Sequence, residues 1–216
     1  MQASVLSVEC LISVECLISV DVETAGPSPS RYALLSIGAC PVDDPARRFY
    51  VELQPDRPAL YPQAAAIHGL ALDRLRRQGM PPAAAMAAFE TWVQTSVGPG
   101  ETPVFVGFNA AFDWMFVADY FERYLRRNPF GHAPLDIKAY YMGLTGVPFL
   151  ATTRRHLAEV YPDVSPLEHH ALQDALDQAE LMRRLIAARA RRTLLSHPEG
   201  WLADGSDPIP SGDPHE

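Results

Sequence analysis

The stretch SVECLISVECLISVDVET (residues 7–24) repeats the hexapeptide SVECLI and changes it in the third copy to SVDVET. Side chains of a β-strand alternate between faces, so a repeat of even length presents the same face in every copy. Only the last copy places two carboxylates, Asp21 and Glu23, on that face. One strand through all three copies would be about 60 Å long at ~3.3 Å per residue, far beyond ordinary strands. We expect the strand to be the copy that touches Asp21 and interpret the upstream copy as an in-frame duplication.

Composition limits the class of protein. The chain has 216 residues, 48% of them hydrophobic, which suits one large domain with a sizeable core. No apolar run is long and charge-free enough to span a bilayer, and the N-terminus lacks the basic start of a signal peptide. The three cysteines form no CxxC pair, so the sequence indicates neither a zinc site nor a disulfide framework. We expect a cytoplasmic protein without membrane attachment.

The net charge of −8 argues against one class of partner. Proteins that grip long duplex nucleic acid through many phosphates are usually basic. A short strand held by metal ions and a few arginines remains compatible with this charge. The arginines within residues 74–77 and 189–192 read more readily as solvated helix faces than as nucleic-acid patches.

The rest of the chain alternates between strand and helix patterns. Two further strands follow the first in close succession, which predicts an antiparallel meander, and shorter strands recur later between helices. The expected strands after the first are 31–42, 47–53, 103–108 and a brief one within 133–144; the expected helices are 70–78, 81–94, 110–127, the second part of 133–144, 154–161 and 171–192. This order predicts an α/β fold with a mixed sheet.

No linker divides the chain, so we expect a single folded domain at residues 16–192. Residues 1–15 are then a duplicated, dispensable segment, and residues 193–216 form a flexible acidic tail rich in proline and glycine. In the last helix, four apolar residues recur at positions i, i+4, i+7 and i+11 and should face the core. They are Ala175, Ala179, Met182 and Ile186.

Asp21 and Glu23 lie two residues apart on the expected first strand, so both side chains leave the same face. Two buried carboxylates side by side are unfavourable unless a positive charge lies between them. A hard divalent cation with oxygen ligands meets that requirement. The alternative is an ordinary solvated strand face, which an Asp-x-Glu pair alone does not exclude.

A second candidate segment is VFVGFNAAFDW (residues 104–114). A buried strand ends near Phe108, Asn109 is placed to cap the next helix, and Asp113 falls in its first turns. The carboxyl end of a central strand is where α/β sheets usually bind ligands. The alternative is a helix-start aspartate favoured by the macrodipole.

The third segment is EHHALQDA (residues 168–175), in which His169 precedes Asp174 by five residues. Five residues rotate a helix by about 140° at ~3.6 residues per turn, so both face one site only if His169 precedes the helix. The upstream SPLE (residues 165–168) resembles a capping box with proline at the first helical position, which would start the helix too early. We interpret SPLE as a separate turn. Taken alone, His169 is an ordinary surface histidine.

Four acids from three segments, together with a histidine, are the components of two-metal phosphodiester hydrolysis. The motifs DVET (21–24), NAAFD (109–113) and HHALQD (169–174), in this order, resemble those of the DEDDh 3′→5′ exonuclease superfamily. The resemblance covers residues 17–192 and is closest to ribonuclease T and, more loosely, to the proofreading epsilon subunit of DNA polymerase III. It implies a ribonuclease H-like three-layer sandwich with a mixed five-stranded sheet.

The resemblance also implies which residues form the catalytic site. In such enzymes four acids hold two Mg²⁺ or Mn²⁺ ions, and the matching positions here are Asp21, Glu23, Asp113 and Asp174. His169 resembles the general base that takes the proton of the attacking water, a role suited to a pKa near neutrality.

Further positions resemble substrate-binding residues. Thr24 matches the segment that meets the terminal 3′-hydroxyl, and His68 matches a histidine near the terminal nucleotide. Phe112 resembles an aromatic residue that stacks on an end base, and it fits a core phenylalanine equally well. We count Asn109, at the same strand end, with this group.

The sequence therefore predicts a metal-dependent 3′→5′ exonuclease that releases nucleoside 5′-monophosphates from single-stranded RNA or DNA ends. The alternative is an accessory module of a polymerase complex with little activity of its own. No motif acid is replaced and the tail lacks an apolar anchor stripe, which favours the enzyme. DNA and RNA are not discriminated, because that choice rests on contacts to the 2′-hydroxyl. Ribonuclease T-like proteins commonly pair, so a homodimer is a further expectation.

Overall fold

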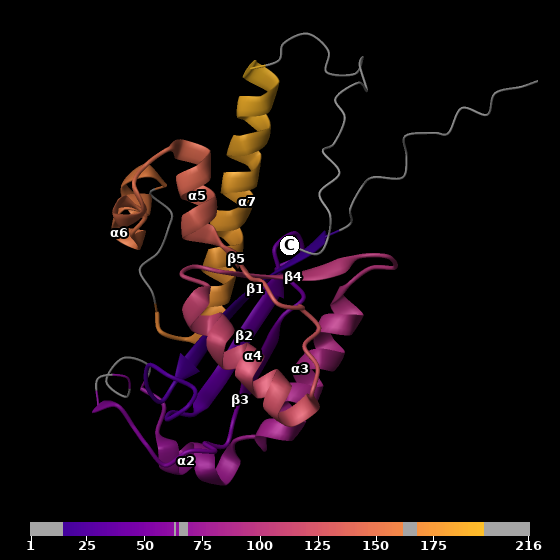
Figure 1. The fold of residues 1–216 in the computed structure, drawn as a ribbon, viewed down its shortest axis with the longest axis vertical. Coiled ribbons are helices and arrows are strands. Elements are labelled where there is room, and N and C mark those ends of the chain that lie inside the picture. Colours follow the sequence, from indigo (N-terminus) through magenta and orange to yellow (C-terminus); the bar gives the residue numbers. More distant parts are fainter. Residues whose placement is uncertain (1–14, 63, 65–68, 162–167, 197–216) are drawn as a thin grey trace, which may run out of the picture.

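The chain folds into a mixed five-stranded sheet with helices on both faces (Figure 1). The computed structural model describes residues 15–62, 64, 69–161 and 168–196. The strand order is β3-β2-β1-β4-β5, antiparallel within β3-β2-β1 and parallel within β1-β4-β5. The strands are β1 (Glu15–Thr24), β2 (Leu34–Pro41), β3 (Phe49–Glu52), β4 (Thr102–Gly107) and β5 (Leu135–Asp136). The predicted meander and the mixed sheet are confirmed.

Helices form the two outer layers. They are α2 (Leu72–Gln78), α3 (Pro82–Ser96), α4 (Ala111–Leu125), α5 (Ile137–Thr145), the short 3-10 helix η2 (Phe149–Ala151), α6 (Arg154–Val160) and α7 (Ala171–Ser196). Two buried clusters separate the layers: α3 and α4 pack on one face of the sheet, and α5 and α7 pack on the other (Figure 1). The predicted three-layer, ribonuclease H-like sandwich is confirmed.

Side chains of β1 point alternately to the two faces of the sheet, and the two sets differ in their surroundings. Ile18, Val20 and Val22 are buried in the apolar cluster beneath α3 and α4. The intervening residues face α7, and the Ser19 hydroxyl donates a hydrogen bond to the Ala175 carbonyl of that helix (2.8 Å). Asp21 and Glu23 continue this second series. The acids of the first motif therefore point toward the last helix of the chain.

A glycine in β2 allows α7 to approach the sheet closely. Gly38 lies directly opposite Asp21 in the antiparallel pair of β1 and β2. A Cβ atom on Gly38 would lie 2.2 Å from the Ala171 carbonyl carbon and 2.2 Å from the Leu172 nitrogen. Only glycine leaves room for the first turn of α7 at this point, beside the carboxylate of β1.

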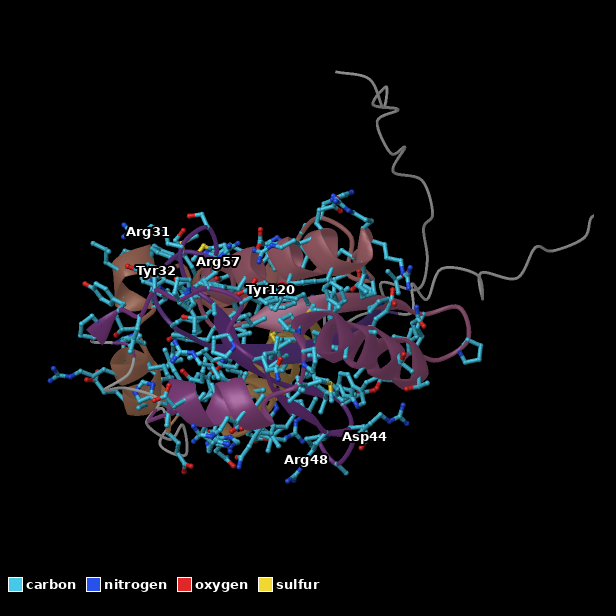
Figure 2. The ribbon with its side chains drawn as sticks, turned by 90° about the horizontal axis from the view of Figure 1, so that it is seen from below. Arg31, Tyr32, Asp44, Arg48, Arg57 and Tyr120 are labelled. Atoms are coloured by element: carbon cyan, nitrogen blue, oxygen red, sulfur yellow. The ribbon has the colours of Figure 1, made fainter. Side chains whose placement is uncertain are left out.

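On the opposite face, Tyr120 anchors α4 to the start of β2. Its ring is fully buried, and its hydroxyl accepts a hydrogen bond from the Leu34 N–H (2.8 Å) and donates one to Asp56. Figure 2 shows Tyr120 in the interior, whereas Asp44 and Arg48 lie at the rim of the molecule. This buried attachment fixes the helix that carries Asp113.

One prediction about α7 is wrong. Ala175, Ala179 and Met182 are buried as expected, but the side chain of Ile186 is 37% exposed. The helix continues to Ser196, past the ends of the described strands (Figure 1), and Ile186 lines an open hollow beside Glu15 and Leu17 at the start of β1 instead of packing in the core. None of the described helices is long and apolar enough to cross a membrane.

Candidate active site

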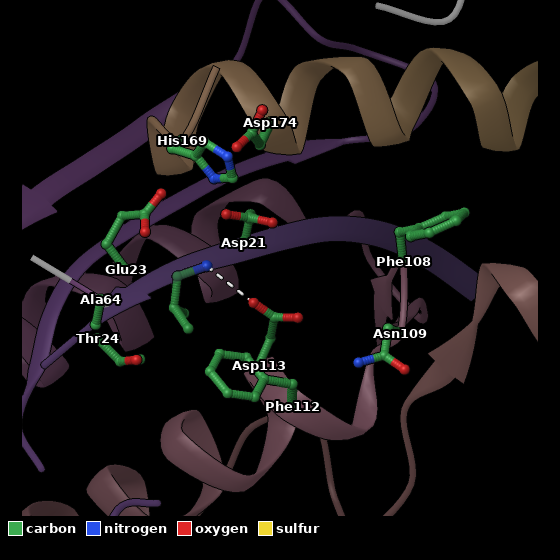
Figure 3. Close-up of a pocket in the computed structure, with 11 residues that line it drawn as sticks. Asp21, Glu23, Thr24, Ala64, Phe108, Asn109, Phe112, Asp113, His169 and Asp174 are labelled. Atoms are coloured by element: carbon green, nitrogen blue, oxygen red, sulfur yellow. Dashed lines mark hydrogen bonds between the residues drawn. The ribbon is translucent and has the colours of Figure 1, made fainter. Parts of the chain in front are cut away.

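Four carboxylates meet at the carboxyl ends of β1 and β4 (Figure 3). We call Asp21, Glu23, Asp113 and Asp174 the acidic cluster. Together with His169 they line a cavity of about 250 Å³, which we call the site cavity. The fold thus brings into one place the five residues that three separate motifs of the sequence single out.

Asp113 lies where β1 and β4 separate. β1 and β4 are paired only up to Ser19 and Val106. Beyond that pair, the Val22 N–H donates a hydrogen bond to Asp113 Oδ1 (3.0 Å) (Figure 3). Asp113 is 5% exposed and lies in the first turn of α4, where the helix macrodipole favours a negative charge. The carboxylate therefore takes the place of a neighbouring strand at the end of β1.

His169 and Asp174 come to the cavity from the start of α7. The helix begins at Ala171, so His169 precedes it, as the rotation argument requires; residues 165–167 of the SPLE turn lie outside the described residues. His169 has a φ of 56°, and the Glu168 N–H donates a hydrogen bond to Asp174 Oδ1 (3.0 Å). One possible ligand atom from each of Glu23, His169 and Asp174 lies within 4.8 Å of the others.

Burial and mutual repulsion raise the pKa values of three carboxyl groups in the acidic cluster. Burial, followed by the charges of Asp113, Asp174 and Glu23, raises the pKa of Asp21 well above its usual range. Burial also raises the pKa of Glu23 to about 8, with Asp174 and Asp113 adding to the effect. For Asp113 burial raises the pKa to about 7. Carboxylates this close are stable in the ionised form only with cations between them, and their oxygen atoms suit hard divalent ions.

The predicted substrate-binding residues are placed in different ways. Thr24, Asn109 and Phe112 line the site cavity, whereas His68 lies outside the described residues. The Thr24 hydroxyl donates a hydrogen bond to the Gly26 carbonyl (2.9 Å). Phe112 also packs against the apolar core, so it lies both at the cavity and against the core, the two positions that the sequence left open.

The prediction that Asn109 caps the following helix is wrong. Asn109 has a φ of 66°, and the N-cap position of α4 is Ala110, without a side-chain cap hydrogen bond. The Ala110 N–H instead donates to Asp136 Oδ2 (2.7 Å). Asparagine tolerates the left-handed conformation better than most residues, which explains its presence at this sharp turn.

Sequence reasoning missed two contacts beside the acidic cluster. Gln178 donates a hydrogen bond to Asp21 Oδ1 (2.6 Å), and His170 stacks on Tyr50 with 4.7 Å between ring centroids. The sequence offers two weak indications. Gln178 follows Asp174 by four residues and shares its helix face, and a glycine in mid-strand, Gly38, often marks a close backbone approach.

The ribonuclease H-like fold and the acidic cluster define a metal-dependent nuclease as the class of protein. Residues 18–182 match the family model RNase_T, described as "Exonuclease". The chain therefore belongs to the RNase_T family of exonucleases and is a 3′→5′ exonuclease of the DEDDh type, as the motifs predict. Membership of this family implies dependence on divalent metal ions.

Individual relatives agree with this assignment. The 3′-5′ DNA exonuclease Cap18 of Escherichia coli is 44% identical over 163 residues, which cover 76% of this chain and 87% of that protein. Among solved structures, the nuclease domain of 3′hExo, a DEDDh family member bound to rAMP, has a TM-score of 0.67 at 14% identity, covering 82% of this chain and 94% of that one. Exonuclease I of E. coli in complex with a dT13 oligonucleotide has a TM-score of 0.63 at 18% identity. The match covers 84% of this chain but 43% of exonuclease I, and both structures support the fold alone.

Proposed function

We propose that this protein removes nucleotides one at a time from the 3′ end of single-stranded DNA. The observation that carries the proposal is the convergence of the acidic cluster and His169 in one cavity. The DNA substrate is inferred from the relative at 44% identity, whose name specifies DNA. We propose a single-stranded substrate because the acidic cluster, His169 and Phe112 line one cavity, so that a terminal nucleotide is surrounded when it binds there. A terminal nucleotide must leave its duplex before it enters.

The acidic cluster holds two Mg²⁺ or Mn²⁺ ions in this proposal. When bound, such a pair activates a water molecule and stabilises the leaving 3′-oxygen of an in-line displacement. The oxygen-only donors of the four acids and their mutual repulsion support this ligand set. Asp21 and Asp113 lie near each other at the end of β1 (Figure 3), and in this proposal the ions that they hold bind the scissile phosphate there.

The remaining residues position the substrate and transfer the proton. His169 accepts the proton of the attacking water on a ring nitrogen, because it is the titratable base next to Glu23 and Asp174. Phe112 supplies an aromatic face for the terminal base, a contact worth about 1–3 kcal/mol. Thr24, which lines the cavity, and the backbone after it hold the terminal 3′-hydroxyl in this proposal.

Digestion of 5′-labelled oligonucleotides tests the proposal. Single-stranded DNA and RNA of the same sequence are incubated with Mg²⁺ or Mn²⁺ and with the wild-type protein or Asp21→Asn. We expect a ladder that shortens from the 3′ end, faster on DNA, and that disappears with EDTA or with Asp21→Asn. Asp73→Asn, a change at an exposed residue of α2, is the matched control. A folded wild-type protein that digests neither polymer would refute the proposal and favour an accessory module.

Several predictions from the sequence accompany this proposal. The exonuclease domain is residues 16–192, preceded by the dispensable duplicate and followed by the acidic tail. We also propose that the protein forms a homodimer and is located in the cytoplasm. Sedimentation of the full chain tests the homodimer directly.

A further inference from the structure

Gln178 joins two parts of the site that are far apart in the sequence. Its side chain is 2% exposed on α7, four residues after Asp174. The Gln178 Nε2 donates a hydrogen bond to Asp21 Oδ1 (2.6 Å), and its Oε1 accepts one from the Phe108 N–H (3.0 Å). A backbone N–H can only donate, so the amide oxygen must face Phe108 and the NH₂ group must face Asp21. The orientation of the amide is therefore fixed by its partners.

Each aspartate of the acidic cluster receives at least one neutral donor within the described chain. The Val22 N–H donates to Asp113 and the Glu168 N–H donates to Asp174. Both of these donors are backbone groups. Asp21 receives its hydrogen bond from the Gln178 side chain instead. Among these donors to the aspartates, Gln178 is therefore the one that a substitution can remove.

We propose that Gln178 is a positioning residue for the metal site, which fixes the rotation of the Asp21 carboxylate and locks it to the Phe108 backbone. With Oδ1 held by Gln178, the second oxygen of Asp21 carries no hydrogen bond among the described residues and stays available to an ion. Donors of this kind around ligating groups typically contribute about 10–100-fold to metal affinity or activity.

The second hydrogen bond connects Gln178 to the segment that follows β4. Phe108 follows β4, the strand paired with β1, and lines the site cavity. Because Gln178 contacts both Asp21 and Phe108, it sets the separation between the ion ligand and the segment that leads to Asn109 and Phe112. A buried glutamine that merely satisfies the Phe108 N–H would do none of this.

Gln178→Met separates these two explanations. Methionine has nearly the same length and flexibility, but it can neither donate to Asp21 nor offer the Phe108 N–H an amide oxygen, so the affinity for Mn²⁺, and not the loss of stability, distinguishes the two explanations. Gln173→Met is the matched control, because Gln173 is on the same helix and also donates to an aspartate, Asp177 (3.0 Å), outside the site cavity. Titration of the full chain with Mn²⁺ in a calorimeter, without nucleic acid, measures the affinity independently of turnover.

The inference rests on the proposed metal site, and the wild-type titration tests that site first. We expect Gln178→Met to weaken Mn²⁺ binding by about 10-fold or more, and to lower kcat at a fixed Mn²⁺ concentration with little change in KM for the oligonucleotide. Added Mn²⁺ should restore part of the lost kcat, and Gln173→Met should behave as the wild type.

Wild-type Mn²⁺ affinity in Gln178→Met would overturn the inference, even if the variant melts at a lower temperature. If that variant does not fold, Gln178→Asn replaces it; its amide keeps the polarity but is one methylene too short to bridge both partners. A wild-type protein that binds no Mn²⁺ would refute the proposed function and this inference with it.

Discussion

Replacing Gly38 with alanine is expected to inactivate the enzyme without altering any residue of the acidic cluster. The added Cβ atom would lie 2.2 Å from the backbone of Ala171 and Leu172. Backbone atoms cannot rotate away as the end of a side chain does. To restore a contact of 3.4 Å, the start of α7 must move away from the sheet by about 1.2 Å.

This shift separates the two halves of the site. Asp174 and His169 move with the start of α7, whereas Asp21 stays on β1 opposite residue 38. A displacement of ~1 Å at reacting groups lowers the rate by about 100-fold. Forcing an extra methyl group into a close contact also lowers the free energy of unfolding by about 1–3 kcal/mol.

The assay compares kcat on 5′-labelled single-stranded DNA with the free energy of unfolding from urea denaturation. Gly143→Ala is the control, because a Cβ atom on that helical glycine meets nothing within 4 Å. Alanine is the better helix former by about 1 kcal/mol, so the control should be active and at least as stable as the wild type. A Gly38→Ala variant with wild-type kcat would refute the reasoning, since the close contact would then be irrelevant to the site.

Three further predictions test other parts of the molecule. The pKa of Glu23 rises from 4.5 in the unfolded chain to about 8 when folded, so without metal the folded state keeps a proton that the unfolded state loses. In EDTA, the melting temperature should therefore fall as the pH rises from 4.5 to about 8. Calorimetry should show a shallower fall for Glu23→Gln, and the same slope in both proteins would contradict the prediction. A chain that starts at Ser13 should keep wild-type kcat, and loss of folding would make the duplicated copy a structural element. His170→Ala removes the ring stacked on Tyr50 and should lower kcat about 2- to 10-fold, the equivalent of ~0.5–1.5 kcal/mol, with unchanged Mn²⁺ affinity; an unaltered kcat would show that the stack does not hold His169 in place.

The features that follow from local periodicity were accessible from the sequence. Alternation in SVDVET places Asp21 and Glu23 on one strand face, and the helix rotation requires His169 to precede α7. Both statements depend on the geometry of a single element. The order of the motifs then supplied the family and the fold.

Features that depend on distances between elements were not accessible. Ile186 fits the apolar stripe of α7, but its exposure depends on where the sheet ends. Asn109 has the right residue type for a cap, but Asp136 from another strand satisfies the Ala110 N–H instead. Gln178 reaches Asp21 across 157 positions of the chain, a separation over which spacing carries no information.

The hydrogen bond from Val22 to Asp113 bears on how an inactive form should be made for trapping a complex with nucleic acid. Alanine at position 113 removes the proposed ion-ligating carboxylate but also leaves the Val22 N–H without its acceptor, at a cost of about 1–3 kcal/mol. Asparagine keeps an amide oxygen that the same N–H can reach, while it lowers the charge of the site. Asp113→Asn is therefore the form in which we expect to capture an intact oligonucleotide without loosening the end of β1.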